Sequence, residues 1–305
     1  SGVTTSRVGL GTWAIGGWMW GGTDEARSIA TIRAAVEQGI TLIDTAPVYG
    51  FGRSEEIVGR ALAGGLRDRV TIATKVGIAW RDGKPYRDGR RQRVVREIED
   101  SLRRLRTDVI DLYQVHWPDP EEEIEAAIGT LARLREQGKL RWIGVSNFSV
   151  DQMKRAMKIA PITSLQPPYS MLRRAVEAEI LPFAKENGIG VINYSPMLSG
   201  MLTGKMTAER VAALPANDWR RKNIEFSEPR LSRNLQLVEE LREIGNGHGV
   251  SPGVVAVAWT LHHPAITAAI VGGRSGKQVE EMVAALTFRL SEDEYERIGK
   301  FLESM

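Results

Sequence analysis

The sequence predicts an α/β fold, a (β/α)₈ TIM barrel formed as a single domain over residues 1–305. Three observations favour this fold. The length of 305 residues suits an α/β barrel, which commonly takes roughly 250 residues and grows by loop insertions. Short apolar runs alternate eight times with segments of helical spacing, and most of these runs end in a polar residue or a glycine. Such alternation is typical of a parallel sheet covered by helices.

The predicted strands are the apolar runs at residues 8–10, 42–43, 70–73, 109–115, 142–145, 164–165, 191–192 and 268–271. Between them apolar residues recur at helical spacing, as at Ile29, Ile32 and Val36. A doubly wound sheet is a weaker interpretation, because the order Gly-x-Gly-x-x-Gly does not follow the first run. The segments 77–93 and 196–229 are too long for simple connections, so we expect long loops over the C-terminal face of the barrel.

Composition excludes several classes of chemistry. With no cysteine, the chain forms no disulfide, thiolate metal site or cysteine nucleophile. The 41 Lys and Arg against 38 Asp and Glu leave a net charge of +3, so we expect no nucleic-acid partner. Only 4 His, without a His-x-His pair, predict no metal site. No apolar run approaches the ~18 residues of a membrane span, and the first residues lack the apolar middle of a signal peptide. We therefore expect a cytoplasmic protein with no membrane partner.

In a barrel, residues at the carboxyl ends of the strands converge on one mouth. The segment 40–50 shows this pattern clearly, because an apolar run ends in Asp44 and is followed by Tyr49. Taken alone, Asp44 could cap the next helix and Tyr49 could be one more half-buried aromatic residue. The later strand ends complete a coherent set with Lys75, His116, Ser146, Asn147, Gln166, Tyr194 and Ser195.

This set predicts a proton donor for the reduction of a carbonyl group. A phenol has an ordinary pKa near ~10, and an ammonium group close to it lowers that pKa. We expect Lys75 to act on Tyr49 in this way, held in place and kept charged by Asp44. His116 could then orient a carbonyl oxygen or relay a proton. None of these side chains supplies a hydride, so a cofactor must.

These residues resemble a known family, the aldo-keto reductases, over nearly the whole chain. Gly11-Thr12-Trp13 is similar to the end of the family's first strand, and Asp44-Thr45-Ala46-x-x-Tyr49-Gly50 to its active-site signature. The resemblance implies a barrel that binds NADP(H) in extended form. It also implies that Tyr49 is the general acid/base of a catalytic tetrad completed by Asp44, Lys75 and His116.

The same resemblance implies which residues bind the cofactor. At the nicotinamide they are Tyr194, which would stack on the ring, and Ser146, Asn147 and Gln166, which would hold its carboxamide. Gly11, Thr12, Trp13 and Asp44 are also expected to bind the cofactor. Stacking on an aromatic face, with amide partners at the carboxamide, fixes which side of the nicotinamide faces the substrate. The loop expected over the pyrophosphate contributes Ser195, Pro196, Leu198, Gly200 and Lys205. A glycine turn followed by a cation suits a polyanion.

The end of the last strand is expected to bind the adenosine half of the cofactor through Gly272, Arg274, Lys277, Gln278 and Glu281. Arg274 would pair with the 2′-phosphate, since a guanidinium fork suits a phosphate dianion, and this favours NADPH over NADH. The alternative is that Arg274 is a solvated residue at a helix start. Many relatives in the family carry Asn where Met282 stands, so NAD(H) is kept as a second cofactor.

Three tryptophans, Trp20, Trp80 and Trp117, fall in loops after predicted strands and are candidates for the wall of a substrate pocket, although ordinary packing explains each one equally well. The stretches 11–22 and 43–62 resemble most closely the bacterial branch of the family that reduces small aldehydes such as glyceraldehyde and oxidises polyols. We therefore predict an NADP(H)-dependent enzyme that interconverts aldehydes or ketones with alcohols.

Two other functions are kept as alternatives. One is a cofactor-binding regulatory subunit with slow turnover, and robust turnover of simple aldehydes would count against it. The other is a barrel lyase or isomerase that uses the same acid and lysine without nicotinamide, and failure of NADPH to bind would support it. The sequence leaves open the physiological substrate, the preferred direction and the choice between a monomer and a small homo-oligomer.

Overall fold

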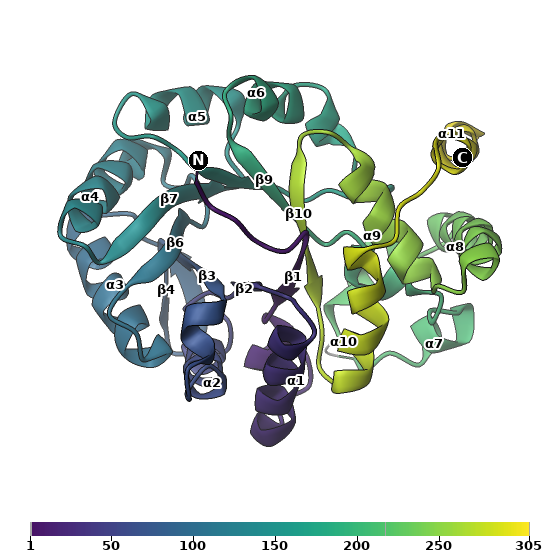
Figure 1. Cartoon of the computed structure of the whole chain (residues 1–305), viewed down its shortest axis with the longest axis horizontal. Helices are drawn as coiled ribbons and strands as arrows, with labels where there is room; N and C mark the ends of the chain where they lie inside the picture. Colours follow the sequence, from purple (N-terminus) through teal and green to yellow (C-terminus); the bar gives the residue numbers. More distant parts are fainter. Residues whose placement is uncertain (1, 217, 305) are drawn as a thin grey trace.

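The strands of the protein close into a parallel barrel, seen end-on in Figure 1. The computed structural model describes residues 2–216 and 218–304, so both ends of the predicted 1–305 domain, and residue 217, lie outside the described residues. Within these residues eight strands form the barrel in the neighbour order β1-β10-β9-β8-β7-β6-β3-β2. They are β1 (Val8–Gly11), β2 (Leu42–Asp44), β3 (Thr71–Val76), β6 (Ile110–Val115), β7 (Leu140–Ser146), β8 (Ser164–Gln166), β9 (Gly190–Tyr194) and β10 (Ile266–Gly272). The predicted (β/α)₈ barrel is confirmed.

Helices surround the barrel, and α1 to α6 each connect one barrel strand to the next (Figure 1). The chain segment between β9 and β10 is longer and holds α7, α8 and α9. The helices are α1 (Glu25–Glu37), α2 (Arg53–Ala61), α3 (Arg91–Leu105), α4 (Ile124–Glu136), α5 (Val150–Met157), α6 (Ile180–Glu186), α7 (Ala208–Ala212), α8 (Arg230–His248), α9 (Pro252–His262), α10 (Gly276–Val283) and α11 (Glu292–Ser304).

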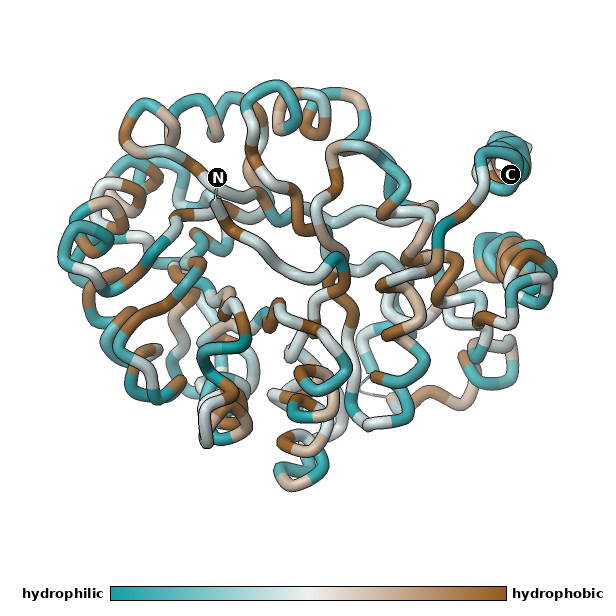
Figure 2. Tube along the Cα trace, in the orientation of Figure 1, coloured by the Kyte–Doolittle hydropathy of each residue, from teal (hydrophilic) through white to brown (hydrophobic). Residues whose placement is uncertain are grey.

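Apolar residues form two cores, one between strands and helices and a smaller one inside the barrel. Figure 2 shows the apolar stretches along the strands and the inner sides of the helices. The inner core is built by Leu42, Ala73, Leu112, Ile192, Ala268 and Ile270. Because side chains alternate between the two faces of a strand, the residue two positions after an inward one also points inward. Asp44 follows Leu42 and Lys75 follows Ala73, so both polar side chains reach the C-terminal mouth.

The two long segments both contain structure of their own. Segment 77–93 holds a β-hairpin of β4 (Ile78–Arg81) and β5 (Lys84–Arg87), which the sequence interpretation had missed. Its turn has positive φ at both central residues, 50° at Asp82 and 72° at Gly83, as a two-residue type I′ turn requires. Segment 196–229 folds into the 3₁₀ helices η5 (Leu198–Thr203), η6 (Trp219–Lys222) and η7 (Ile224–Phe226), together with α7.

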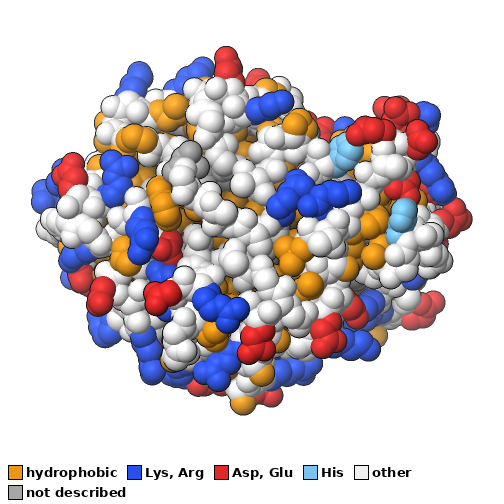
Figure 3. Space-filling model, in the orientation of Figure 1, with side chains coloured by type: hydrophobic (Ala, Val, Ile, Leu, Met, Phe, Trp, Pro, Cys, Tyr) orange, Lys and Arg blue, Asp and Glu red, His pale blue; other side chains and the backbone are white. Residues whose placement is uncertain are grey.

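The outer surface carries charges of both signs, which Figure 3 shows interspersed on one face. Some form ion pairs between neighbouring helices: Glu25 of α1 pairs with Arg53 and Arg60 of α2. Pairs as exposed as these contribute about 0–1 kcal/mol each, so the buried cores dominate stability. Among the described residues, no helix combines the length and apolar character that a membrane crossing requires.

A buried carboxyl on α3 predicts an unusual dependence of stability on pH. Glu97 is 1% exposed, and its Oε2 accepts hydrogen bonds from the Gly77 N–H at 3.3 Å and the Arg93 Nε–H at 3.1 Å. Burial raises the pKa of Glu97 to about 7 from its ordinary value of 4.5, against the opposing effect of Arg93. Between these values the folded state holds a proton that the unfolded state has released.

The free energy of unfolding should therefore fall by up to about 3 kcal/mol as pH rises from the unfolded to the folded pKa, and stay level above it. Glu97→Gln has no carboxyl group to titrate at this position, so its free energy of unfolding should lack this part of the dependence on pH. Urea unfolding of both proteins near about pH 5 and near about pH 8 measures the effect. An equal difference between wild type and variant at both pH values would show that Glu97 does not titrate in this range.

Candidate active site

A buried ion pair lies at the centre of the barrel mouth. Asp44 ends β2 and Lys75 lies in β3, and they are 3% and 0% exposed. Lys75 Nζ donates to both carboxylate oxygens of Asp44 at 2.8 Å and to the carbonyl of Thr45 at 2.9 Å. Burial lowers the pKa of Lys75 from its ordinary value, and Asp44 opposes that effect. Asp44 therefore holds the ammonium in place and favours its charged form, as expected.

Tyr49 brings its hydroxyl to this pair from the loop after β2. Lys75 Nζ lies 3.3 Å from the phenol oxygen. The sequence interpretation expected the lysine to lower the phenol pKa, but in the structure burial and then Asp44 raise the pKa of Tyr49 well above 10. Desolvation disfavours the phenolate more strongly here than the ammonium favours it. That expectation was wrong, and the phenol is protonated at neutral pH.

His116 follows β6 and packs against the ring of Tyr49. Its ring lies edge-on to the ring of Tyr49, with centroids 6.0 Å apart. Burial, then Lys75 and Arg87, lower the pKa of His116 well below 6.5. The imidazole is therefore neutral at pH 7 and offers one N–H donor and one acceptor nitrogen.

The loop that carries Tyr49 is fixed by close backbone packing and by hydroxyl groups. Gly50 adopts φ +65°, and a Cβ there would lie 2.1 Å from the carbonyl oxygen of Gly16 in the loop after β1. The hydroxyl of Ser54 lies 2.7 Å from that of Thr12 and 3.0 Å from that of Thr45. These contacts tie the loops after β1 and β2 together and set the position of the phenol.

Gly50→Ala should therefore damage both stability and turnover. The added Cβ meets backbone that has no room to move, so we expect a loss of at least about 2 kcal/mol and a displaced Tyr49. Gly138→Ala is the matched control, since Gly138 has φ +78° with no atom within 4 Å of an added Cβ. Urea midpoints and kcat of the two variants measure the difference. Equal losses would show that backbone strain alone, and not the contact with Gly16, accounts for the effect.

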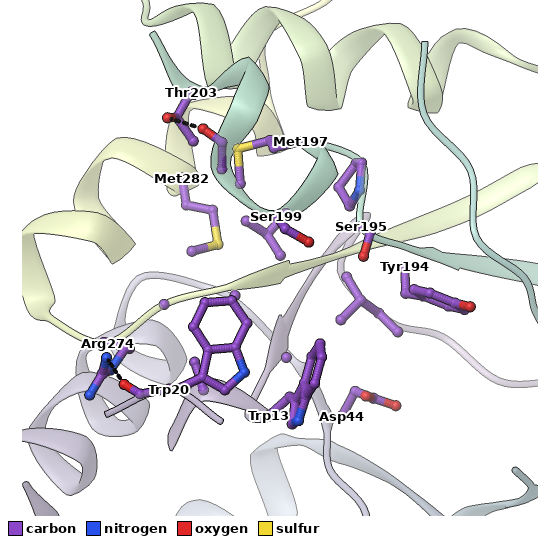
Figure 4. A pocket seen from close by; sticks show the side chains of 18 of the residues that line it. Trp13, Trp20, Asp44, Tyr194, Ser195, Met197, Ser199, Thr203, Arg274 and Met282 are labelled. Carbon is purple, nitrogen blue, oxygen red and sulfur yellow. Dashed lines mark hydrogen bonds between the residues drawn. The ribbon is translucent and has the colours of Figure 1, made fainter. Parts of the chain in front are cut away.

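A cavity of about 610 Å³ extends from Tyr49 to α10, a size typical of ligand sites (Figure 4). Most residues expected at the cofactor do line it: Gly11, Trp13, Asp44, Ser146, Asn147, Gln166, Tyr194, Ser195, Pro196, Gly200, Lys205, Gly272, Arg274, Gln278 and Glu281. Three do not. Thr12 is buried beneath the loops, Leu198 is 2% exposed in the core, and Lys277 is exposed on α10.

The residues expected at the nicotinamide form one hydrogen-bonded group. Gln166 Nε2 donates to Asp44 Oδ2 at 2.8 Å, and Ser146 Oγ donates to the carbonyl of Gln166 at 2.8 Å. The hydroxyl of Tyr194 donates to Asn147 Oδ1 at 2.9 Å, which fixes the tilt of the Tyr194 ring. These hydrogen bonds thus hold this part of the cavity wall rigidly, next to Asp44.

The loop after β9 has an unusual backbone. Ser195, Leu198 and Ser199 all have positive φ, at 57°, 44° and 54°, and Gly200 follows at 98°. Such conformations cost of order 1–3 kcal/mol each in residues other than glycine, and they cluster at ligand sites. Successive backbone N–H groups in left-handed conformations form concavities that bind anions. The loop therefore suits a phosphate group.

At the far end of the cavity, charged residues form an ion pair across its opening. Lys205 Nζ donates to Glu281 Oε1 at 2.7 Å, which connects segment 196–229 to α10. The guanidinium of Arg274, between β10 and α10, donates to no carboxylate among the described residues, and the Arg274 backbone N–H donates to Gln278 Oε1 at 2.7 Å. The guanidinium of Arg274 instead donates to two carbonyls of the loop after β1.

Of the three tryptophans expected in the substrate wall, Trp20 and Trp117 line the cavity and Trp80 does not. Trp20 packs edge-on against Trp13, with ring centroids 5.3 Å apart. Trp117 is 37% exposed and carries the guanidinium of Arg87 at 4.7 Å from its ring centroid. Trp80 instead packs against Phe51.

The lining residues that were missing from the expected set include Ile78, Pro85, Arg210 and Arg220. Ile78 and Pro85 belong to the hairpin, and the Asp82-Gly83 dipeptide was the sequence signal for it. Arg220 donates to Asp218 through Nε and Nη2, and its guanidinium lies 5.6 Å from the centroid of the Trp20 ring. No local pattern in the sequence marked Arg210 or Arg220 as lining residues.

The chain was compared with known proteins. A model of the Aldo/keto reductase family matches residues 7–303. Aldo-keto reductase YhdN of Bacillus subtilis (strain 168) is 46% identical over 306 residues, which cover 100% of this chain and 92% of that protein. The NADH-specific methylglyoxal reductase of Escherichia coli (strain K12) is 34% identical over 318 residues, with 99% and 96% covered. The solved structure of the glycerol dehydrogenase AKR11B4 from Gluconobacter oxydans matches with a TM-score of 0.93 at 41% identity, over 100% of this chain and 93% of that chain.

Proposed function

The chain belongs to the aldo-keto reductase family, whose members catalyse oxidation and reduction with a nicotinamide cofactor, and we propose that it reduces small aldehydes and ketones with NADPH. In this proposal Tyr49 is the general acid/base. The observation that carries this proposal is the position of the phenol. The hydroxyl of Tyr49 lies 3.3 Å from Lys75 Nζ, and this ammonium is in turn held by Asp44. Tyr49 and Asp44 line the large cavity, and Lys75 is buried next to them.

The cavity offers groups that could bind the phosphates of a dinucleotide. Lys205, Arg210 and Arg274 line it, and the backbone of 195–200 offers N–H groups to an anion. The indole N–H of Trp20 is buried in the wall and has no acceptor among the described residues, so a ligand oxygen would satisfy it. We propose that Tyr194, Ser146, Asn147 and Gln166 hold the nicotinamide end, and that the loop after β9 holds the pyrophosphate. When bound, the cofactor supplies the hydride to the carbonyl carbon.

The protein supplies the proton. The raised pKa keeps the Tyr49 phenol protonated, so it can donate to the carbonyl oxygen as that oxygen gains negative charge. Lys75 then stabilises the phenolate that remains, and Asp44 keeps Lys75 charged. The neutral ring of His116 donates an N–H to the same oxygen and orients the carbonyl. In the direction of alcohol oxidation, the same groups accept the proton.

The choice between NADPH and NADH depends on Arg274 in this proposal. Arg274→Ala should weaken NADPH binding by roughly 10- to 100-fold, because it removes charge-assisted hydrogen bonds to the 2′-phosphate, and should change NADH binding little. Fluorescence titration of wild type and variant with both cofactors measures the ratio. The relative from Escherichia coli is described as NADH-specific. Equal losses for both cofactors would remove the assignment of Arg274 to the 2′-phosphate.

We propose glyceraldehyde and similar small aldehydes as substrates, with polyols as substrates of the reverse reaction. The neighbouring structure of a glycerol dehydrogenase supports this choice. Membership of a family of oxidoreductases favours an enzyme over a slowly turning regulatory subunit.

Isotope transfer tests the proposed chemistry. NADPH carrying deuterium at the pro-R position of C4 should transfer it to C1 of the glycerol formed from glyceraldehyde, with one cofactor consumed per product. NADPH labelled at the pro-S position is the control and should give unlabelled glycerol. Deuterium from the pro-S label, or reduction without transfer, would overturn the proposed orientation of the nicotinamide.

A further inference from the structure

Arg274 makes two contacts that its proposed role at the 2′-phosphate does not require. Its Nη1 donates to the carbonyl of Trp20 at 2.9 Å (Figure 4). Its Nη2 donates to the carbonyl of Gly22 at 2.8 Å. Both carbonyls belong to the loop between β1 and α1, which we call the tryptophan loop, residues 17–22. One guanidinium thus joins the end of the last barrel strand to the loop after the first.

The tryptophan loop has little else to fix its tip. Gly21 and Gly22 have φ of 77° and 89°, and an added Cβ at either position would meet no atom of residues 2–216 and 218–304 within 4 Å. Within the loop, the N–H groups of Trp20 and Gly22 both donate to the carbonyl of Gly17. The position of the turn therefore depends on the two hydrogen bonds from Arg274, on the packing of the Trp20 ring, and on the packing of Trp18 against Phe51, with ring centroids 5.0 Å apart.

The Trp20 ring is connected to the catalytic residue Tyr49 through Trp13. Trp20 packs edge-on against Trp13 at 5.3 Å between centroids, and Trp13 lies 6.2 Å from the ring of Tyr49. On its other side the Trp20 ring carries the guanidinium of Arg220. A movement of the backbone at Trp20 would therefore move the aromatic wall beside the reacting carbonyl.

We propose that Arg274 is a positioning residue for the substrate pocket, and that it couples the cofactor's 2′-phosphate to the position of Trp20. This rests on the proposed function, in which NADPH binds with its 2′-phosphate at Arg274. A guanidinium has five N–H donors, and the two loop carbonyls use two of them. Three donors remain for a phosphate. The loop carbonyls and the 2′-phosphate can therefore bind the Arg274 side chain at the same time, and binding of either one orders the side chain for the other.

Coupling of this kind is reciprocal and is measured as a ratio of affinities. With NADPH the loop is held and the wall is formed, so the KM for an aldehyde should be lower. NADH has no 2′-phosphate, so the Arg274 guanidinium binds only the loop carbonyls. The KM for an aldehyde should then be about fivefold or more higher than with NADPH, which is the lower end of typical coupling between two sites. Arg274 thus makes the identity of the cofactor affect the affinity for the substrate.

The first experiment concerns the protein alone. Amide hydrogen exchange of residues 17–24 should be faster in Arg274→Ala than in wild type, because the loop loses both hydrogen bonds. Lys277→Ala is the matched control: it removes a neighbouring cation that contacts neither loop carbonyl, and should leave the exchange of this segment unchanged. Unchanged exchange in Arg274→Ala would overturn the proposal.

The second experiment measures the KM for glyceraldehyde with NADPH and with NADH at saturating cofactor. Wild type should show the lower KM with NADPH, and Arg274→Ala should show the same, higher KM with both. Equal KM values in wild type would overturn the coupling. A lack of turnover with either cofactor would overturn the coupling together with the proposed function, while the exchange experiment would still report the contact between Arg274 and the loop.

Discussion

Replacing Tyr49 by Phe should leave NADPH affinity unchanged and reduce kcat by roughly 10²- to 10⁴-fold, the usual contribution of a positioned general acid. The ring keeps its contact with Trp13, at 6.2 Å between centroids, and its edge contact with His116, so the cavity keeps its shape. Only the hydroxyl next to Lys75 is lost. Steady-state reduction of an aldehyde, together with a fluorescence titration by NADPH, separates the two effects.

Two controls make this result specific. Lys75 should retain its contacts with Asp44 and Thr45 in the variant, so the urea midpoint should stay close to that of wild type. Tyr194→Phe removes a second phenol in the same cavity, whose hydroxyl donates to Asn147, and should affect cofactor binding more than kcat. A Tyr49→Phe enzyme with unchanged kcat would remove the phenol from the mechanism.

Replacing Asp44 by Ala should destabilise the protein by about 3–5 kcal/mol, because it leaves the Lys75 ammonium buried without its carboxylate. Gln166 Nε2 would also lose the acceptor that it now has in Asp44. Turnover should fall as well, since the pKa of Lys75, which burial already lowers, would fall further without Asp44. Urea unfolding followed by circular dichroism gives the change in midpoint and slope.

The double variant Asp44→Ala/Lys75→Met tests the cause of this loss. With both charges removed, the barrel mouth contains no uncompensated ion, so the double variant should be more stable than Asp44→Ala alone. It should nevertheless have no more activity than the single variant, because the ammonium beside Tyr49 is gone. A double variant that is less stable than both single variants would mean that packing, and not charge, determines the effect.

The barrel strands could be predicted because buried parallel strands appear in a sequence as continuous apolar runs bounded by polar residues. Each predicted run overlaps a strand of the barrel, from β1 at Val8–Gly11 to β10 at Ile266–Gly272. The strand-end residues followed from the same pattern, since fold topology alone brings them to one mouth. Thus Asp44, Lys75 and Tyr49 could be placed together before any distance was known.

What the sequence did not reveal depends on contacts between distant segments. The bonds from Arg274 to the carbonyls of Trp20 and Gly22 join residues more than 250 positions apart, and a backbone acceptor leaves no trace in residue identity. The direction of the Tyr49 pKa shift was wrong because burial opposes the neighbouring charge, and spacing cannot weigh one against the other. The hairpin of β4 and β5 was missed although Asp82-Gly83 marks it.

The most direct test of this account is a fluorescence titration of the protein with NADPH and with NADH, followed by addition of DL-glyceraldehyde to the same sample. Tryptophans line the cavity, so cofactor binding should quench their emission. The account predicts tighter binding of NADPH than of NADH and oxidation of the bound cofactor once the aldehyde is added. Absence of binding by either cofactor would contradict the assignment of the cavity, and binding without oxidation would contradict the proposed role of Tyr49 toward small aldehydes.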